Sequence, residues 1–277
     1  MTDYKIRKNK QMQSSPNFDT LTRKFDGPNV SAIALVGSYA RGTAGLFSDV
    51  DLVRFLNNDI SPSPRDGSYL IDDLLVTINS ANPRQIEAWF SCPEIAVNVI
   101  SGLRSGPALL DRSGTFEGIQ RRARAFTWNA EMQQKADRWA AQQMVGWIEE
   151  VHKGLEGLRS KDIGRMLNAR FGCSWGLSRV VGVHKGVLLS GDNGFYDEVG
   201  EVVGLDSEWV KLRRTAFGIE GQDGKAPGLQ EQVVAGLQLF VATVRLLGNI
   251  FEPVDAIFVK QTIKLIETEL GSQLIIN

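Results

Sequence analysis

The chain has 277 residues, of which 43% are hydrophobic and 23% are charged, and its formal net charge is -1. This composition is typical of a globular protein with enough apolar material for one large domain or two ordinary ones. The near-zero net charge argues against a nucleic-acid binder, because such proteins usually carry a strongly positive surface. Two cysteines and two histidines without metal-ligand spacing are too few for a zinc site.

The first residues are polar and charged, which does not fit a signal peptide. The most apolar stretch, residues 233–244, is interrupted by Gln238 and is shorter than the roughly 20 residues that a membrane span needs. We therefore expect no membrane partner. A reduced, cytoplasmic setting is consistent with two cysteines that lie far apart in the sequence.

The first hundred residues mix strand and helix signals, separated by glycine and proline. Residues 69–78 fit either one strand or a hairpin that turns at Asp72-Asp73. The other expected elements are a helix within 14–25, strands at 31–36 and 49–56, a helix at 84–90 behind Pro83, and strands at 95–100 and 108–111.

From about residue 115 onward, apolar residues recur at spacings of three and four, which predicts helices. The expected helices are 116–128, 133–158, 162–189, 195–203, 207–217, 230–249 and 254–270. We predict an α+β protein, in which a small mixed β-sheet domain with flanking helices (residues 1–120) precedes an all-α helical bundle (residues 121–277).

One stretch, Ile33 to Leu52, has a pattern that indicates chemistry: IALVGSYARGTAGLFSDVDL. Alternate residues of a strand share a face, so Asp49 and Asp51 place their carboxylates on the same side, about 6.6 Å apart along the strand. Two such charges repel each other unless a cation joins them. A pair of this kind suits Mg²⁺ or Mn²⁺ bound together with substrate phosphates.

The residues before this pair suit a phosphate ligand. Gly37 lets the backbone approach an anion closely, and Ser38 adds a hydroxyl donor. Arg41 can reach a phosphate oxygen as a forked donor. Ser48 could cap the turn or support a carboxylate. Together the two halves of the stretch predict a site for a nucleoside triphosphate, ATP by preference, with a divalent metal.

This combination resembles the nucleotidyltransferase superfamily that includes DNA polymerase β. By that resemblance, Gly37 and Ser38 would hold the triphosphate, and Asp49 and Asp51 would be the metal ligands. Residues 1–120 would then form the catalytic domain and residues 121–277 a helical substrate-binding domain. The length and the helical second half look most like the small-molecule branch, which includes the kanamycin and other aminoglycoside nucleotidyltransferases.

A third carboxylate, present in many members on a later strand, is harder to place. The expected strand at 74–78 has none, and Asp72 and Asp73 would serve only if that strand were continuous through them. Glu149 and Lys153 share a helix face at i and i+4. They resemble the Glu-x-x-x-Lys pair of the kanamycin branch, which implies that Glu149 is the general base and Lys153 a phosphate ligand. An ordinary exposed ion pair is the alternative.

The implied reaction is the metal-dependent transfer of a nucleoside monophosphate, AMP by preference, to a hydroxyl of a small molecule such as an aminoglycoside-like compound. One alternative is AMP transfer to a protein or RNA acceptor, although the net charge argues against RNA. Another is an inactive nucleotide-binding regulatory module, which the missing strand carboxylate would explain. The kanamycin branch also implies that a homodimer could share the site.

Overall fold

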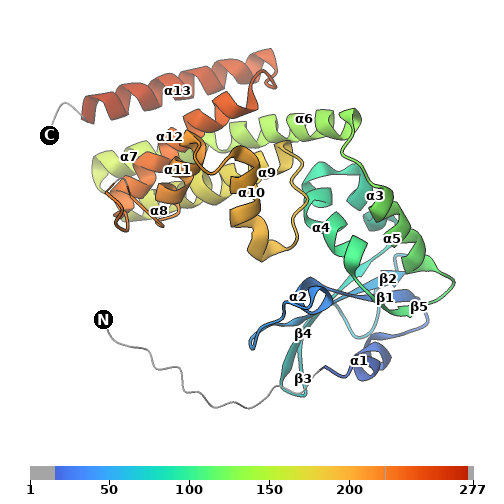
Figure 1. Ribbon diagram of the computed structural model, residues 1–277. Coiled ribbons are helices and arrows are strands. Elements are labelled where there is room, and N and C mark those ends of the chain that lie inside the picture. The colour runs from blue at the N-terminus through green and yellow to red at the C-terminus, as the bar shows by residue number, and fades with distance from the viewer. Residues whose placement is uncertain (1–15, 222, 274–277) are drawn as a thin grey trace. The chain divides into compact units, whose positions relative to one another are not determined.

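The computed structural model describes residues 16–221 and 223–273, and the chain forms two compact units. The first, here the sheet unit, extends to Ala88 and resumes over Ile100–Phe126. The second, the helical unit, comprises Trp89–Val99 and the chain from Thr127 onward. The α+β prediction is confirmed, since a five-stranded mixed sheet occupies one unit and helices build the other (Figure 1).

The sheet has the strand order β3-β4-β2-β1-β5. β2 and β4 are parallel, while the pairs β1/β2, β1/β5 and β3/β4 are antiparallel. The strands are β1 (Val30–Val36), β2 (Val50–Leu56), β3 (Gly67–Ile71), β4 (Leu74–Ala81) and β5 (Ala108–Asp111). The helices that begin in this unit are α1 (Phe18–Phe25), α2 (Gly37–Arg41), α3 (Pro83–Ser91) and α5 (Thr115–Ala125), and α4 (Pro93–Ser105) ends in it.

Residues 69–78 form the hairpin rather than the single strand. Asp72 and Asp73 have φ values of 49° and 62°, which is the left-handed conformation of a two-residue hairpin turn. Aspartate tolerates this conformation better than most residues with a Cβ atom. β3 and β4 pair directly on either side of the two aspartates, with Ile71 opposite Leu74.

The strand expected at residues 95–100 is wrong, because these residues belong to helix α4. The buried side chains Ala96, Ile100 and Leu103 recur at spacings of four and three, which is a helical face. Pro93 is the first residue of this helix, a position where its missing N–H costs nothing. A segment of six residues, five of them apolar, does not by itself distinguish a strand from a buried helix.

The helical unit buries a core of aliphatic and aromatic side chains, centred on α12 (Leu229–Leu247). Its other helices are α6 (Ala130–Gly146), α7 (Ile148–Ser160), α8 (Ile163–Phe171), α9 (Leu177–His184), α10 (Phe195–Val203), α11 (Glu208–Ala216) and α13 (Pro253–Gln273). A short 3-10 helix, η2 (Asp192–Gly194), precedes α10. Within the described residues, no helix has the length and apolar character to cross a membrane.

Two of the expected long helices are interrupted. The helix expected at 133–158 is divided at Trp147 into α6 and α7. The helix expected at 162–189 contains a π-helical turn, η1 (Gly172–Gly176), between α8 and α9. At Gly176 a Cβ atom would lie 2.4 Å from the Trp147 indole ring, so the glycine makes room for that tryptophan. π-Helical turns within helices are often found at functional sites.

Candidate active site

The two aspartates of the motif lie where three strands run side by side. In the strand register, Asp51 pairs with Val36 at the end of β1 and with Thr77 of β4. Asp49 directly precedes β2, and its Oδ2 accepts a hydrogen bond from Thr77 Oγ1 at 3.2 Å. The backbone register therefore holds the two carboxylates and the threonine hydroxyl together on one face of the sheet.

Gly37 lies directly against Asp51. A Cβ atom at Gly37 would lie 2.1 Å from Asp51 Oδ2, and the φ of Gly37 is +68°. Both the conformation and the close approach therefore require glycine at this position. The Gly-Ser turn and the aspartate strand, separated by eleven residues or more in the sequence, thus meet at a single point.

The remaining motif residues have different surroundings. Ser38 lies in the first turn of α2, and its carbonyl accepts a hydrogen bond from the backbone N–H of Thr43 at 3.0 Å. Arg41 ends α2 with an exposed side chain. The Oγ of Ser48 accepts a hydrogen bond from the backbone N–H of Gly45 at 2.8 Å, so this serine stabilises the turn that leads into β2.

Asp72 and Asp73 do not lie beside the carboxylate pair. Thr77 is the β4 residue next to Asp51, and Asp73 precedes it by four residues, or about 13 Å along the strand. The hairpin is therefore excluded as the origin of a third carboxylate, and Glu149 is the candidate that remains. Among the described residues, no cluster of three or more histidine, cysteine, aspartate or glutamate side chains could hold a metal.

Thr77 and its neighbour Ser68 belong to this site but were not predicted from the sequence. Ser68 pairs with Thr77 across the β3/β4 hairpin, and the two hydroxyl oxygens are 3.3 Å apart. Because Thr77 donates its proton to Asp49, Ser68 is the donor to Thr77. The signal was the hairpin itself, since a turn at Asp72-Asp73 fixes the alternation of β4 and places Thr77 on the aspartate face.

Glu149 and Lys153 pair as the i, i+4 spacing predicts. Lys153 Nζ lies 2.8 Å from Glu149 Oε1 and 2.7 Å from Glu150 Oε1. The side chain of Glu149 is 74% exposed, whereas that of Glu150 is 16% exposed. The hydrogen bond and charge of Lys153 lower the pKa of Glu149, and the two glutamates raise the pKa of Lys153, which keeps both partners charged.

This pair lines a cavity of about 630 Å³ in the helical unit. His152 is in the same wall, and α8 and α13 contribute the charged side chains of Arg165 and Glu269. Glu149 thus borders a polar recess, although most of its side chain is exposed to solvent. Its role as a base toward a hydroxyl stays a prediction.

One comparison with known proteins concerns the region that contains the sheet motif. The sequence profile described as "Nucleotidyltransferase domain" matches residues 19–95, which include Gly37, Ser38, Asp49 and Asp51. The match over residues 19–95 to a nucleotidyltransferase domain supports nucleotidyl transfer in general. A comparison with curated proteins gives no significant match.

Among solved structures, the chain is similar to a nucleotidyltransferase-like protein from Exiguobacterium sibiricum 255-15. The sequences are 13% identical, the similarity covers 82% of this chain and 73% of that one, and the TM-score is 0.48. Similarity at this level says nothing about the substrate of either protein.

Proposed function

We propose that the protein is a metal-dependent nucleotidyltransferase that moves a nucleoside monophosphate, AMP by preference, from a nucleoside triphosphate to a hydroxyl of a small molecule. The observation that carries this proposal is the meeting of Gly37 with Asp51, inside a region that matches a nucleotidyltransferase domain. The aminoglycoside nucleotidyltransferase branch, a homodimer and a cytoplasmic setting stay predictions.

The donor atoms fit Mg²⁺ or Mn²⁺ bound together with a nucleotide. Asp49 and Asp51 provide two carboxylates on one face, and the described residues provide no third acidic ligand. Mg²⁺ typically takes one or two carboxylates and completes its coordination with substrate phosphates and water. When bound, such an ion would neutralise charge that develops on the transferring phosphate.

The protein groups would bind and orient the reactants. Gly37 lets the triphosphate approach the backbone, with Ser38 and Arg41 as donors to phosphate oxygens. Glu149 would take the proton of the acceptor hydroxyl as its oxygen bonds to the α-phosphorus and the bond to the β-phosphate oxygen breaks, which releases pyrophosphate. Lys153 would contact the phosphates, and Ser48 would hold the turn before Asp49.

A second function, nucleotide binding without transfer, is favoured by one observation. The later strand beside β2 is β4, and it provides no carboxylate next to Asp51, because that position holds Thr77. If Glu149 does not act as the base, the sheet unit would bind a nucleotide and metal without activating an acceptor. The two functions differ in one measurable product, pyrophosphate.

The test is a pyrophosphate-release assay of the full chain with ATP, GTP, CTP and UTP, against aminoglycosides, lincosamides and a metabolite extract. Calorimetry with ATP and Mg²⁺ is run beside it. In Asp51→Asn the metal ligand is lost, so we expect turnover to fall at least 100-fold without unfolding. Asp73→Asn is the matched control, because asparagine also tolerates the turn conformation.

Release of pyrophosphate that needs Asp51 but not Asp73 supports transfer, and labelled α-phosphate then identifies the acceptor as a small molecule, a protein or RNA. Tight ATP binding without pyrophosphate supports the binding module. Full activity of Asp51→Asn, or no nucleotide binding at all, would contradict the proposed site.

A further inference from the structure

The helical unit contains a second cavity, of about 490 Å³, that none of the motif residues line. Its walls come from α4, α8, η1, α9, η2 and α10, together with Trp147 at the junction of α6 and α7. A backbone hydrogen bond of 2.8 Å from Leu189 to Val97 joins two of these walls. The volume lies within the range of small-molecule binding sites, roughly 300–1,000 Å³.

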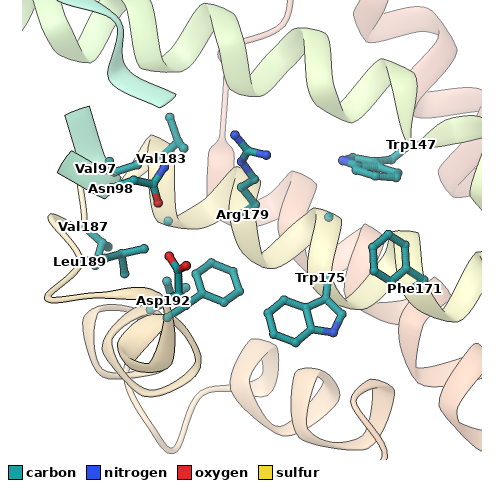
Figure 2. Close-up of a pocket in the computed structure, with 14 residues that line it drawn as sticks. Val97, Asn98, Trp147, Phe171, Trp175, Arg179, Val183, Val187, Leu189 and Asp192 are labelled. Atoms are coloured by element: carbon teal, nitrogen blue, oxygen red, sulfur yellow. The ribbon is translucent and has the colours of Figure 1, made fainter. Parts of the chain in front are cut away.

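Aromatic side chains dominate one wall of this cavity (Figure 2). Phe171 and Trp175, at i and i+4, are 63% and 47% exposed despite their apolar surface. Trp175 stacks on Phe195 with the ring centroids 5.5 Å apart and the planes 9° from parallel. Large exposed rings on a concave surface favour an aromatic or apolar ligand, because covering them removes apolar area from water.

The π-helical turn shapes this wall. Gly172 and Gly176 of η1 allow the Trp147 indole to pack against the backbone, where a Cβ atom at either position would lie 3.0 Å or less from the ring. Phe171 at the end of α8, Trp175 within the turn and Arg179 of α9 all line the cavity.

Two charged side chains line the cavity among the described residues, Arg179 and Asp192. Asp192 begins η2 and precedes α10, where a carboxylate favours the helix start. Arg179 stacks on the Trp139 ring at 5.8 Å, and within the part of the chain that the structure describes it forms no ion pair. Its guanidinium is therefore available to a carboxylate or another acidic group.

We propose that this cavity binds an aromatic or aliphatic small molecule that carries one acidic group. The rings hold the apolar part of the molecule, and Arg179 binds the acidic group. A polycation fits poorly, because the described lining offers a single carboxylate. The lining of the cavity supports this ligand whether or not the proposed nucleotidyl transfer takes place.

The test is calorimetric titration of the full chain with three matched probes: 2-naphthoate, 2-naphthamide and 2-naphthylmethylammonium. We expect naphthoate to bind at least fivefold more tightly than the other two, because only its carboxylate pairs with Arg179. Arg179→Gln should weaken naphthoate by about fivefold to tenfold and leave naphthamide within about twofold. Trp175→Ala should weaken naphthoate and naphthamide by about fivefold.

Two control variants locate the effect. Asp192→Asn removes the other charge of the lining and should not weaken naphthoate. Arg165→Gln removes an exposed arginine that does not line this cavity and should leave all three probes unchanged. Tighter binding of the ammonium probe, naphthoate binding insensitive to Arg179 and Trp175, or no binding of any probe would overturn the proposal. Asp51→Asn should bind naphthoate normally, which separates this result from that of the transfer assay.

Discussion

The carboxylate site of the sheet unit and the cavity of the helical unit are built in different ways. In the sheet unit, strand register sets the positions of Val36, Asp51 and Thr77, and Gly37 approaches through its backbone. In the helical unit, the cavity surface consists of side chains that come from six elements between Val97 and Val199. A site fixed by backbone geometry tolerates few substitutions, whereas a side-chain surface can change its ligand while the fold persists.

Among the described residues, two arginines are fully buried, and the two units stabilise them in different ways. Arg54 of β2 binds Asp66, Ser80 and the carbonyl of Pro64. Burial alone would raise the pKa of Asp66, but hydrogen bonds from Ser80 and Arg54 outweigh it and lower the pKa. The sheet unit thus neutralises its buried charge with an opposite charge.

Arg213 of α11 lies among aromatic rings, the nearest being Tyr196 at 4.3 Å. It donates hydrogen bonds to Ser178 and to the carbonyl of Tyr196, and burial lowers its pKa to about 10. The helical unit therefore stabilises a cation largely with ring faces. Each unit thus stabilises its buried arginine with the groups that its own fold brings close. The substitutions below test this comparison of the two units.

The largest effect is expected for Gly37→Ala. The new Cβ would collide with Asp51 Oδ2 and force alanine to a φ of +68°. Left-handed strain of about 1–2 kcal/mol and the collision together should lower the free energy of unfolding by about 2–4 kcal/mol. Displacement of Asp51 should also remove nucleotidyl transfer. Chemical denaturation and the pyrophosphate assay measure the two effects.

Gly42→Ala is the matched control for this change. Gly42 has nearly the same φ, +69°, but no atom lies within 4 Å of a Cβ built there. Only the strain, about 1 kcal/mol, should remain, and activity should persist. Equal losses of activity in the two variants would show that the contact with Asp51 has no special importance.

The sequence could predict the sheet site because its information is local. Gly37, Asp49 and Asp51 lie within fifteen consecutive residues, and a strand's alternation places both carboxylates on one face. The hairpin at Asp72-Asp73 was one of two alternatives, and the choice between them determines whether Thr77 is recognised. The two aspartates favoured the hairpin, because aspartate is common in tight turns.

The cavity and the breaks in the helices could not be predicted in the same way. The break at Trp147 coincides with the packing of its ring on Gly172 and Gly176, which lie 25 and 29 residues further on. The strand expected at 95–100 was wrong because a six-residue segment with five apolar residues fits either periodicity. Where long-range packing decides the structure, local patterns leave it open.

A smaller effect is expected for Glu149→Gln, which tests whether the helical unit also contributes to the reaction. If Glu149 takes the proton from the acceptor, turnover should fall about 100-fold with little change in nucleotide affinity. Glu131→Gln is the matched control, because Glu131 pairs with Lys135 at i, i+4 with similar exposure. Equal activity of the two variants would assign Glu149 to an ordinary surface ion pair.

The smallest effect is expected from the titration of His184, which lies in the helical unit and contacts Asp137 Oδ1 through Nδ1 at 2.9 Å. Burial lowers the pKa of His184, and the charge of Asp137 opposes this only in part, with Lys185 adding to the decrease. The unfolded chain therefore binds this proton more readily than the folded one does. The contribution of His184 to the free energy of unfolding is fully present above about pH 6.5. It should be lost as the pH falls through the lower pKa of the folded state.

Tryptophan fluorescence during urea unfolding can measure this decrease, because all six tryptophans belong to the helical unit. We expect a loss of no more than about 1 kcal/mol between pH 7 and pH 5 from this group. His184→Gln should reduce the pH dependence in that interval, whereas His152→Gln, at an exposed position, should leave it unchanged. If His184→Gln keeps the full pH dependence, protonation of carboxylates rather than of this imidazole destabilises the helical unit in acid. The helical unit would then depend on charged carboxylates, as the sheet unit does at Asp66.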